Sequence, residues 1–288
     1  MSCLARLAAP PLFLAVLAGC VPPVDGTEFS PVQNLTQAVG GFREDRAARD
    51  VPFTNAELAT NFSRIAFGVE EEFRDVSAQG PEMIRRWEMP IRWTVTSRSP
   101  RAEDQAQTVS KTFDRLSAAT GLDIAEAPSF IGANFIVTFA GTQDYAAEAD
   151  RWRELAGASG IADFIDRFAT DPTTPCQGVF FFSRSDNAET GRRLGSIRFA
   201  LVIIRDALPE TFRQVCAEEE LAQTLGLAND DPRVRPSVFN DDQEFAFLTE
   251  HDEYLLRILY DPRLGPGVGR EDAMAIVPDI IEELRPGG

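Results

Sequence analysis

The chain has 288 residues, a formal net charge of −17 and a single histidine, His251. Its length suffices for one large domain or two small ones, and its 45 acidic against 28 basic residues argue against binding to nucleic acid or to anionic lipid headgroups. One histidine excludes zinc enzymes with three histidine ligands and those built on the two-histidine HExxH motif.

Residues 1–19 predict a lipoprotein signal peptide. Arg6 precedes an apolar stretch over 7–17, which is shorter than the ~20 residues of a membrane-spanning helix but typical of a signal peptide. The Leu-Ala-Gly-Cys sequence that ends at Cys20 resembles the lipobox of bacterial lipoproteins. The resemblance implies cleavage before Cys20, a lipid on Cys20, and anchoring to the outer membrane facing the periplasm, since Val21 rather than Asp follows. A chance match after an ordinary signal peptide is the alternative.

The next two segments are predicted to precede the main domain. Residues 20–52 are polar, contain Pro, Gly, Asn and Gln, and show no sustained period, so they predict a flexible tether that follows the lipidated cysteine. Residues 53–87 are predicted to form an N-terminal helical extension. Within it, apolar residues recur at helical spacing over 55–68, with Asn55 as a candidate N-cap.

Residues 88–288 are predicted to form a single α+β domain. Apolar runs and apolar–polar alternation predict strands, and apolar residues at helical spacing predict helices. The predicted strands span 90–96, 133–140, 177–184 and 197–205, and the predicted helices span 102–119, 142–155, 160–168, 209–226, 250–260 and 270–284. Gly121 and Gly226 are the expected ends of two of these helices.

Two cysteines remain in the mature chain once Cys3 has left with the signal peptide and Cys20 carries lipid. In an oxidising compartment of the envelope, Cys176 and Cys216 are expected to form one disulfide. Two buried free thiols are the alternative, because the sequence does not give the distance between them.

The segment at 219–227 reads Glu-Glu-Leu-Ala-Gln-Thr-Leu-Gly-Leu. It resembles the active-site helix of metzincin-type zinc peptidases, whose motif is His-Glu-x-x-His-x-x-Gly-x-x-His/Asp. By this resemblance Glu219 and Gln223 stand at the first two zinc-ligand positions. Asn229 falls at the third position, with Asp230 beside it. Each position that holds an imidazole in the peptidases therefore holds an oxygen-bearing side chain in this chain.

The resemblance to metzincins covers about residues 88–265. It places Glu220 at the position of the general base and Gly226 at the glycine that turns the chain. The segment 236–240 lies where a methionine turn is expected but carries phenylalanine, and 247–260 resembles the final helix of such domains. The implied fold is a zincin-like domain with a mixed twisted sheet, an active-site-type helix and a C-terminal helical part.

A second resemblance is to an uncharacterised family of envelope lipoproteins, a domain of unknown function. It rests on Cys-x-x-Glu-Glu-x-x-Gln…Leu-Gly-Leu over 216–227 and on Tyr-Asp-Pro-Arg-Leu over 260–264. It implies no established activity.

The candidate ligands allow two interpretations. Residues 219 and 223 are one helical turn apart, so both can reach one ion, and their oxygens suit Ca²⁺, Mg²⁺ or Mn²⁺ better than Zn²⁺. A divalent metal held by Glu219, Gln223 and Asn229 or Asp230 is one alternative, with Glu220 as base. The favoured interpretation is a domain without cofactor, in which Glu218–Glu220 is a solvated charge run and Gln223 bonds the following loop.

Two further clusters are expected to be structural. His251 is expected in the first turn of a helix capped by Thr249 or its neighbours, rather than as a base or ligand. The loop with Asn, Asp and Glu at 229–231 and 240–244 is expected to form Asx turns, with a Ca²⁺ site as the alternative.

The expected function is non-catalytic binding or scaffolding by a periplasmic lipoprotein attached to the membrane through Cys20. Its partners would be envelope proteins or an extended peptide that adds to the edge strand before the active-site-type helix, with neither nucleic acid nor nucleotide. The alternatives are a metal-dependent peptidase or hydrolase and a purely structural envelope lipoprotein.

Overall fold

The computed structural model describes residues 42–68, 82–141, 143–154, 159–171, 173–240 and 244–288. The predicted signal peptide, Cys20 and the predicted tether up to residue 41 lie outside the described residues, as do residues 241–243 of the acidic loop. Among the helices that are described, none combines the length and the apolar character needed to cross a bilayer.

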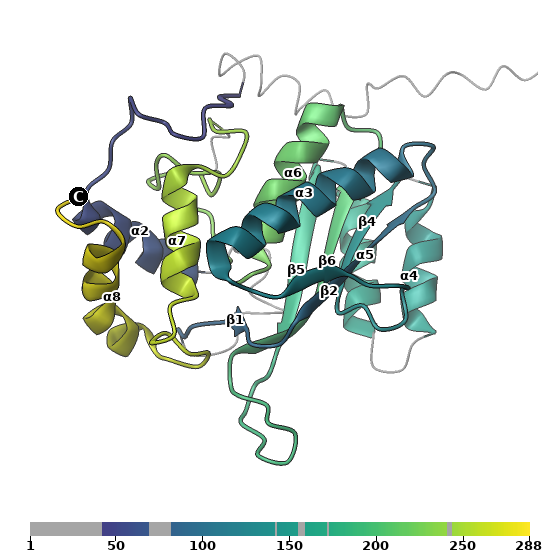
Figure 1. Ribbon diagram of the computed structural model, residues 1–288. Coiled ribbons are helices and arrows are strands. Elements are labelled where there is room, and N and C mark those ends of the chain that lie inside the picture. Colours follow the sequence, from purple (N-terminus) through teal and green to yellow (C-terminus); the bar gives the residue numbers. More distant parts are fainter. Residues whose placement is uncertain (1–41, 69–81, 142, 155–158, 172, 241–243) are drawn as a thin grey trace, which may run out of the picture.

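A mostly parallel sheet forms the centre of the fold (Figure 1). Its strands are β1 (Arg86–Trp87), β2 (Ile91–Ser97), β3 (Ile124–Glu126), β4 (Phe135–Ala140), β5 (Cys176–Phe182) and β6 (Ser196–Arg205). The order is β1-β6-β4-β2-β3, with parallel pairing throughout, and β5 pairs with β6 in antiparallel orientation. All six residues of β4 are buried, as expected of a strand with helices over both faces.

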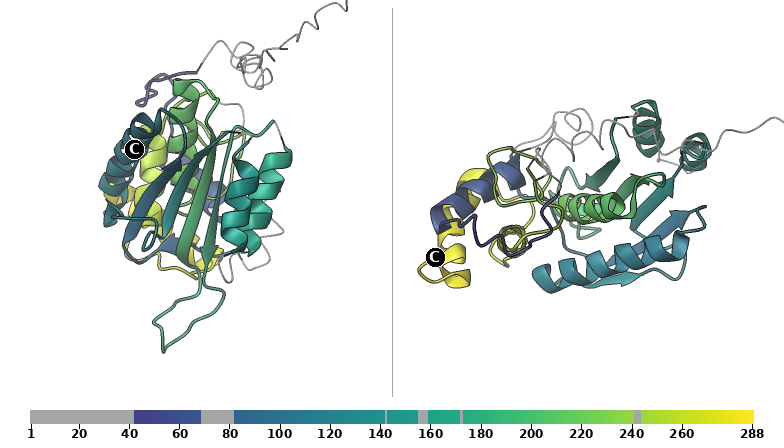
Figure 2. Two further views of the ribbon diagram at one scale, coloured as in Figure 1. Left: turned by 90° about the vertical axis from the view of Figure 1, so that its right-hand side faces the viewer. Right: turned by 90° about the horizontal axis from the view of Figure 1, so that it is seen from above.

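The helices are α2 (Asn55–Phe67), α3 (Ala102–Thr120), α4 (Tyr145–Arg153), α5 (Ser159–Thr170), α6 (Glu210–Gln223), α7 (Glu250–Leu259) and α8 (Arg270–Leu284). Helices α3 and α6 cover one face of the sheet, and α4 and α5 cover the other (Figure 2). Alternate strand residues supply the two cores, since Val137 packs with the first pair of helices and Ile136 with the second. These elements confirm the predicted α+β class.

The remaining helices, α2, α7 and α8, form a group beside the sheet (Figure 1). Leu58 and Phe62 of α2 share one hydrophobic core with the sheet and with α6, and β1 pairs with the start of β6. The described residues of the expected N-terminal extension, 53–68 and 82–87, therefore contribute to the same hydrophobic core as the sheet and α6.

Two local predictions need correction. The N-cap of α2 is Thr54 rather than Asn55, because the Thr54 hydroxyl accepts from the Glu57 N–H and the Glu57 carboxylate accepts from the Thr54 N–H. Strands β1 and β3 were not expected from the sequence. By contrast, α3 ends where predicted, at Gly121 in the left-handed conformation with φ 73°.

Residues 42–53, which we call the strap, lie along the segment that precedes α7. The Arg43 N–H donates to the Glu244 carbonyl and the Ala246 N–H donates to the Arg43 carbonyl, each at 2.8 Å. Phe42 packs edge-on against Phe212 of α6, with ring centroids 4.8 Å apart. The polar composition predicted a free linker here, but these main-chain bonds hold residues 42–52 against the domain.

Candidate functional site

Helix α6 begins after an extended proline and ends in a turn that requires glycine. Pro209 precedes the helix with φ −55° and ψ 153°. Proline suits this place because the first N–H groups of a helix have no acceptor within the helix, so nothing is lost by its missing N–H. Gly226 has φ +120°, and a Cβ at this position would lie 2.0 Å from the Arg85 carbonyl oxygen. The chain can therefore turn beneath β1 only with glycine at position 226.

A disulfide fastens the edge strand to this helix. Cys176, the first residue of β5, is bonded to Cys216 of α6 with a Cα–Cα distance of 5.8 Å. The predicted disulfide is thus confirmed. Both cysteines are buried, and the bond joins the antiparallel strand to the helix that carries the metzincin-like segment.

Gly178 marks the closest approach of β5 to α6. A Cβ at Gly178 would lie 2.7 Å from Thr224 Cγ2 and 3.0 Å from Glu220 Oε2. The candidate general base, Glu220, therefore has its carboxylate against the edge strand, and only 8% of the residue is exposed. A larger side chain at position 178 would push the strand away from this carboxylate.

The structure brings two of the four candidate ligands together. The Gln223 side-chain amide donates to Asp230 Oδ1 at 2.8 Å. Asn229 serves a different purpose, because its amide donates at 3.2 Å to the Arg64 carbonyl in the last turn of α2. Gln223 thus bonds the loop that follows α6.

Glu219 is half-buried on α6, whereas Glu220 is buried. Neither of these carboxylates is without a partner, and the same holds for Gln223 and Asp230. Within the described part of the chain, His, Cys, Asp and Glu form no group of three or more that could hold a metal ion.

The expectation of a solvated charge run over 218–220 is wrong for Glu218 and Glu220, each of which is 8% exposed. Glu218 accepts hydrogen bonds from both terminal nitrogens of Arg46, at 2.6 and 2.5 Å. It also accepts the Leu248 N–H at 2.9 Å. The correction has a physical cause: Glu218 is buried because the strap brings it a guanidinium partner.

A sequence signal for Glu218 existed in the strap itself. Arg43 and Arg46 stand three residues apart in a segment expected to be a free tether. In the structure, Arg43 lies over the Phe245 ring and Arg46 over the Phe247 ring, each at 4.7 Å from the ring centroid. Such spacing, opposite an acidic helix, could have indicated a docked segment rather than a linker.

The segment after α6 is held by a buried carboxylate. Asp252 accepts the Ser237 hydroxyl, the Val238 N–H at 3.1 Å and the Thr249 N–H at 2.9 Å. Phe239, expected from the sequence at the place of a methionine turn, is fully buried in the core. Residues 237–239 are therefore held against the start of α7.

His251 has a structural position at the start of α7. Its ring is fully buried, and Nε2 accepts from the Asn61 amide at 3.1 Å. That contact places the proton on Nδ1, which lies 3.5 Å from Asp252 Oδ1 without a hydrogen bond of good geometry. As expected, Thr249 caps the helix.

Electrostatics around the site is dominated by arginine–carboxylate pairs. Hydrogen bonding to Arg233 lowers the pKa of Asp231, and hydrogen bonding to Arg235, with a smaller contribution from Arg43, lowers the pKa of Glu244. Burial lowers the pKa of Arg85. Asp231 and Glu244 are therefore ionised well below neutral pH, and their ion pairs hold the chain.

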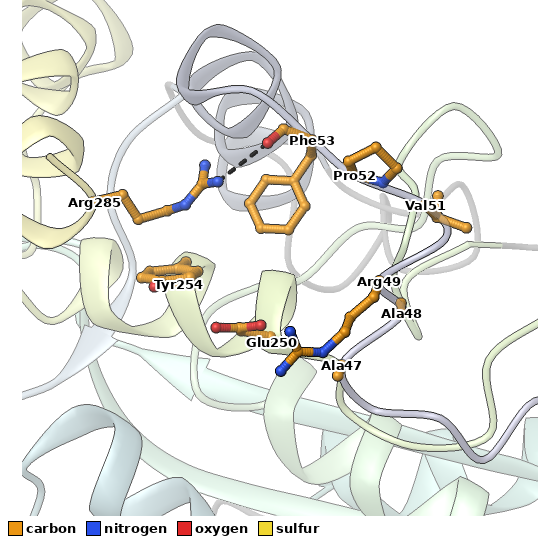
Figure 3. A pocket seen from close by; sticks show the side chains of 9 residues that line it. All are labelled: Ala47, Ala48, Arg49, Val51, Pro52, Phe53, Glu250, Tyr254 and Arg285. Atoms are coloured by element: carbon orange, nitrogen blue, oxygen red, sulfur yellow. Dashed lines mark hydrogen bonds between the residues drawn. The ribbon is translucent and has the colours of Figure 1, made fainter. Parts of the chain in front are cut away.

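A hollow of about 300 Å³ lies between the strap, α7 and the residue after α8 (Figure 3). Arg285 enters it from the end of α8 and donates to the Phe53 carbonyl at 3.2 Å. Its guanidinium lies 4.4 Å from the Phe53 ring centroid and 5.5 Å from that of Tyr254. This cluster joins the strap to the C-terminal end of the chain and lies apart from β5.

Comparison with known families gives one match. The model of a family described as Protein of unknown function (DUF2927) matches residues 55–279, a range that includes the whole sheet and α6. The match agrees with the predicted domain of unknown function. A search of curated proteins finds no match to the chain.

Proposed function

We propose a function for this chain, which belongs to the DUF2927 family of proteins of unknown function. It is a lipoprotein anchored through Cys20 to the outer membrane and facing the periplasm, and its zincin-like domain binds an extended peptide without cleaving it. The observation that carries the proposal is the position of β5, an antiparallel strand fastened to α6 beside Glu220.

The order of the elements supports a zincin-like domain. Strand β2, helix α3, strands β3 and β4, the antiparallel strand β5, strand β6 and helix α6 come in the order expected of metzincin-type domains, and in this chain helices α4 and α5 stand between β4 and β5. Within the described residues, β5 pairs only with β6 and so lies at an edge of the sheet. The helix that would carry the zinc ligands comes directly after β6.

The donor set supports binding rather than catalysis. The first two zinc-ligand positions hold Glu219 and Gln223, and the side chain of Gln223 is bonded to Asp230. Asn229, at the third position, bonds the end of α2. Borderline-soft Zn²⁺ prefers imidazole and thiolate, and these positions offer neither.

An edge strand can accept a peptide through its main chain. The N–H and C=O groups of β5 that point away from β6 are a template for one more strand, and side chains at alternate positions would give selectivity. The disulfide and the contact at Gly178 hold this template rigid, so little conformational entropy is lost on binding.

The test is calorimetric titration of the mature protein, with Cys20→Ser to omit the lipid, using a decapeptide of alternating Val and Ser with blocked ends. The matched control is the same peptide N-methylated at alternate residues, which removes the N–H groups on one edge. We expect the unmodified peptide to bind and the methylated peptide to bind at least tenfold more weakly. Equal binding of both, or no binding of either, would overturn the proposal.

A metal-dependent hydrolase that uses the oxygen ligands of Glu219, Gln223 and Asn229 or Asp230 is the alternative. Its test is elemental analysis and peptide cleavage after incubation with Ca²⁺, Mg²⁺ or Mn²⁺. Stoichiometric metal that is lost in Gln223→Ala, or cleavage that is lost in Glu220→Gln, would replace the non-catalytic proposal with this one.

The membrane anchor is tested separately by metabolic labelling with a fatty-acid analogue. The wild-type protein should incorporate the label and fractionate with the outer membrane, and Cys20→Ser should not be labelled. Label that persists in Cys20→Ser would refute lipidation at this residue.

A further inference from the structure

A hollow of about 330 Å³ lies at the base of the hairpin that joins β5 to β6. This hairpin, residues 183–195, projects beyond the end of the sheet (Figure 1). The last two residues of β5, Phe181 and Phe182, line the hollow, together with the guanidinium-bearing side chains of Arg184, Arg192 and Arg198. An aromatic surface and three cations thus meet where the edge strand ends.

The cations of this hollow are unusual for so acidic a chain. The protein has 45 acidic residues against 28 basic ones, and most of its arginines form ion pairs, yet Arg192 and Arg198 form none within the described residues. Arg184 does have a partner. Of the neighbouring acids, Asp186 accepts the Leu194 N–H and Glu88 pairs with Arg193, and the exposed Glu189 in the turn of the hairpin is not among the residues that line the hollow.

A fourth cation lies on the ring of Phe182. The guanidinium carbon of Arg85 is 5.3 Å from the centroid of that ring, and only 3% of Arg85 is exposed. Its Nε has no hydrogen-bond partner within the described residues. A buried, incompletely paired guanidinium is costly, and among the described residues no carboxylate forms an ion pair with Arg85, so its position on the Phe182 ring adds positive potential at this end of β5.

The hollow lies at the end of the edge strand, because Phe181 and Phe182 are the last residues of β5 and line it. A peptide that adds to β5 in antiparallel orientation runs from Phe182 toward Cys176, so its amino-terminal end would lie beside the three arginines. Planar guanidinium groups bind carboxylates with two parallel hydrogen bonds, and the phenylalanine rings can cover the aliphatic part of an acidic side chain.

We infer that this hollow is a subsite for acidic side chains at the amino-terminal end of a peptide bound along β5. The inference rests on the proposed function and adds to it a substrate class, acidic peptides, and a direction of binding. Charge alone would steer such a peptide weakly, because the chain as a whole is negative, so the preference must be local and must decrease with salt.

The experiment titrates three end-blocked decapeptides into the mature protein by calorimetry at low salt. One is neutral, with alternating Val and Ser; the second has Glu at two of the first three Ser positions; the third has the same two Glu residues at the carboxyl-terminal end. We expect the second peptide to bind about tenfold more tightly than the other two. The difference should be lost in the double variant Arg192→Gln/Arg198→Gln, whose affinity for the neutral peptide stays unchanged.

The matched control is Arg49→Gln/Arg167→Gln, which removes the same charge from exposed positions outside the hollow and should keep the preference. Equal binding of all three peptides would overturn the inference and leave the proposed function standing. A preference for Glu at the carboxyl-terminal end would overturn it as well. If no peptide binds, the proposed function itself fails, and the inference fails with it.

Discussion

At the scale of single residues, Gly226 and Gly121 show two different reasons why a turn requires glycine, namely a positive φ and a lack of space for a Cβ. Both have positive φ, but a Cβ at Gly226 would lie 2.0 Å from the Arg85 carbonyl, whereas nothing lies within 4 Å of one at Gly121. We expect Gly226→Ala to lower the free energy of unfolding by ~2–4 kcal/mol and Gly121→Ala by ~1 kcal/mol. Urea denaturation measures both.

Gly121→Ala is the control for the cost of positive φ alone. Equal losses in the two variants would mean that the backbone at Arg85 moves aside freely. In that case the turn after α6 would not be fixed by its contact with β1.

Asp171 predicts a dependence of stability on pH. Its carboxylate accepts the Thr173 N–H and hydroxyl and the Thr174 hydroxyl, and these bonds lower its pKa from 3.8 to about 2. Because the folded pKa is depressed, the stabilisation is fully present above the unfolded pKa and is lost as the pH falls toward 2.

The variant Asp171→Asn should therefore be less stable than wild type at pH 7, and the difference should shrink between about pH 4 and pH 2. Chemical denaturation at several pH values measures it. Asp163→Asn, at an exposed position of α5, is the control and should show no such trend. A difference for Asp171→Asn that stays constant across this range would contradict the assignment.

The sequence predicts that Glu219 and Gln223 lie on one face of a helix, but it does not predict the groups to which the residues of this segment hydrogen-bond. The spacing of Glu219 and Gln223 follows from the sequence, yet Gln223 bonds Asp230 and Asn229 bonds the end of α2. The Glu218 carboxylate, expected in water, is bonded to Arg46, which lies 172 residues earlier in the chain. Such contacts depend on which distant segment packs on the helix.

At the scale of elements, the disulfide between β5 and α6 is the main constraint on the candidate site. It closes a loop with a sequence separation of 40 residues. We expect Cys176→Ser/Cys216→Ser to lower the free energy of unfolding by ~3–4 kcal/mol, by the loop-entropy estimate. Urea denaturation of the variant, compared with wild type with and without reductant, measures the loss.

Wild type in reductant should then match the double variant. The variant should also bind the Val–Ser decapeptide more weakly, because β5 is no longer held against α6. Unchanged stability in the variant would show that packing alone positions the edge strand.

The long helices and strands could be predicted from the sequence, whereas the shortest strands could not. Long segments such as α3 and β6 carry a sustained hydrophobic period, and their expected ranges agree with the structure to within a few residues. The two-residue β1 and the three-residue β3 carry no period, and they exist because neighbouring strands offer them hydrogen bonds. No local pattern can report such pairing.

At the scale of the whole molecule, the strap links the start of the described chain to the candidate site. Arg46 neutralises the buried Glu218, whereas Arg43 pairs with the exposed Asp50 and with Glu244. We expect Arg46→Ala to lower the free energy of unfolding by ~2–3 kcal/mol, because it leaves a buried carboxylate without its cation. Arg43→Ala should cost clearly less than Arg46→Ala, as expected of more exposed pairs.

Thermal and urea denaturation of the two variants measure this difference. A similar small loss in both would mean that Glu218 is readily hydrated when Arg46 is removed. The strap would then be a weakly attached end of the tether rather than a part of the folded domain.

The sequence by itself determined the α+β class and the long helices and strands, because periodicity is a property of the chain alone, and it predicted the cysteine pair that the structure confirms. It also located the helix with Glu219, Glu220 and Gln223. Only the tertiary structure decided that β5 lies at the sheet edge beside Glu220, that the strap buries Glu218, and that three arginines meet at the end of β5. The physical reason is that each of these arrangements depends on packing between segments far apart in the chain, and a local hydrophobic pattern carries no information about which distant segments meet.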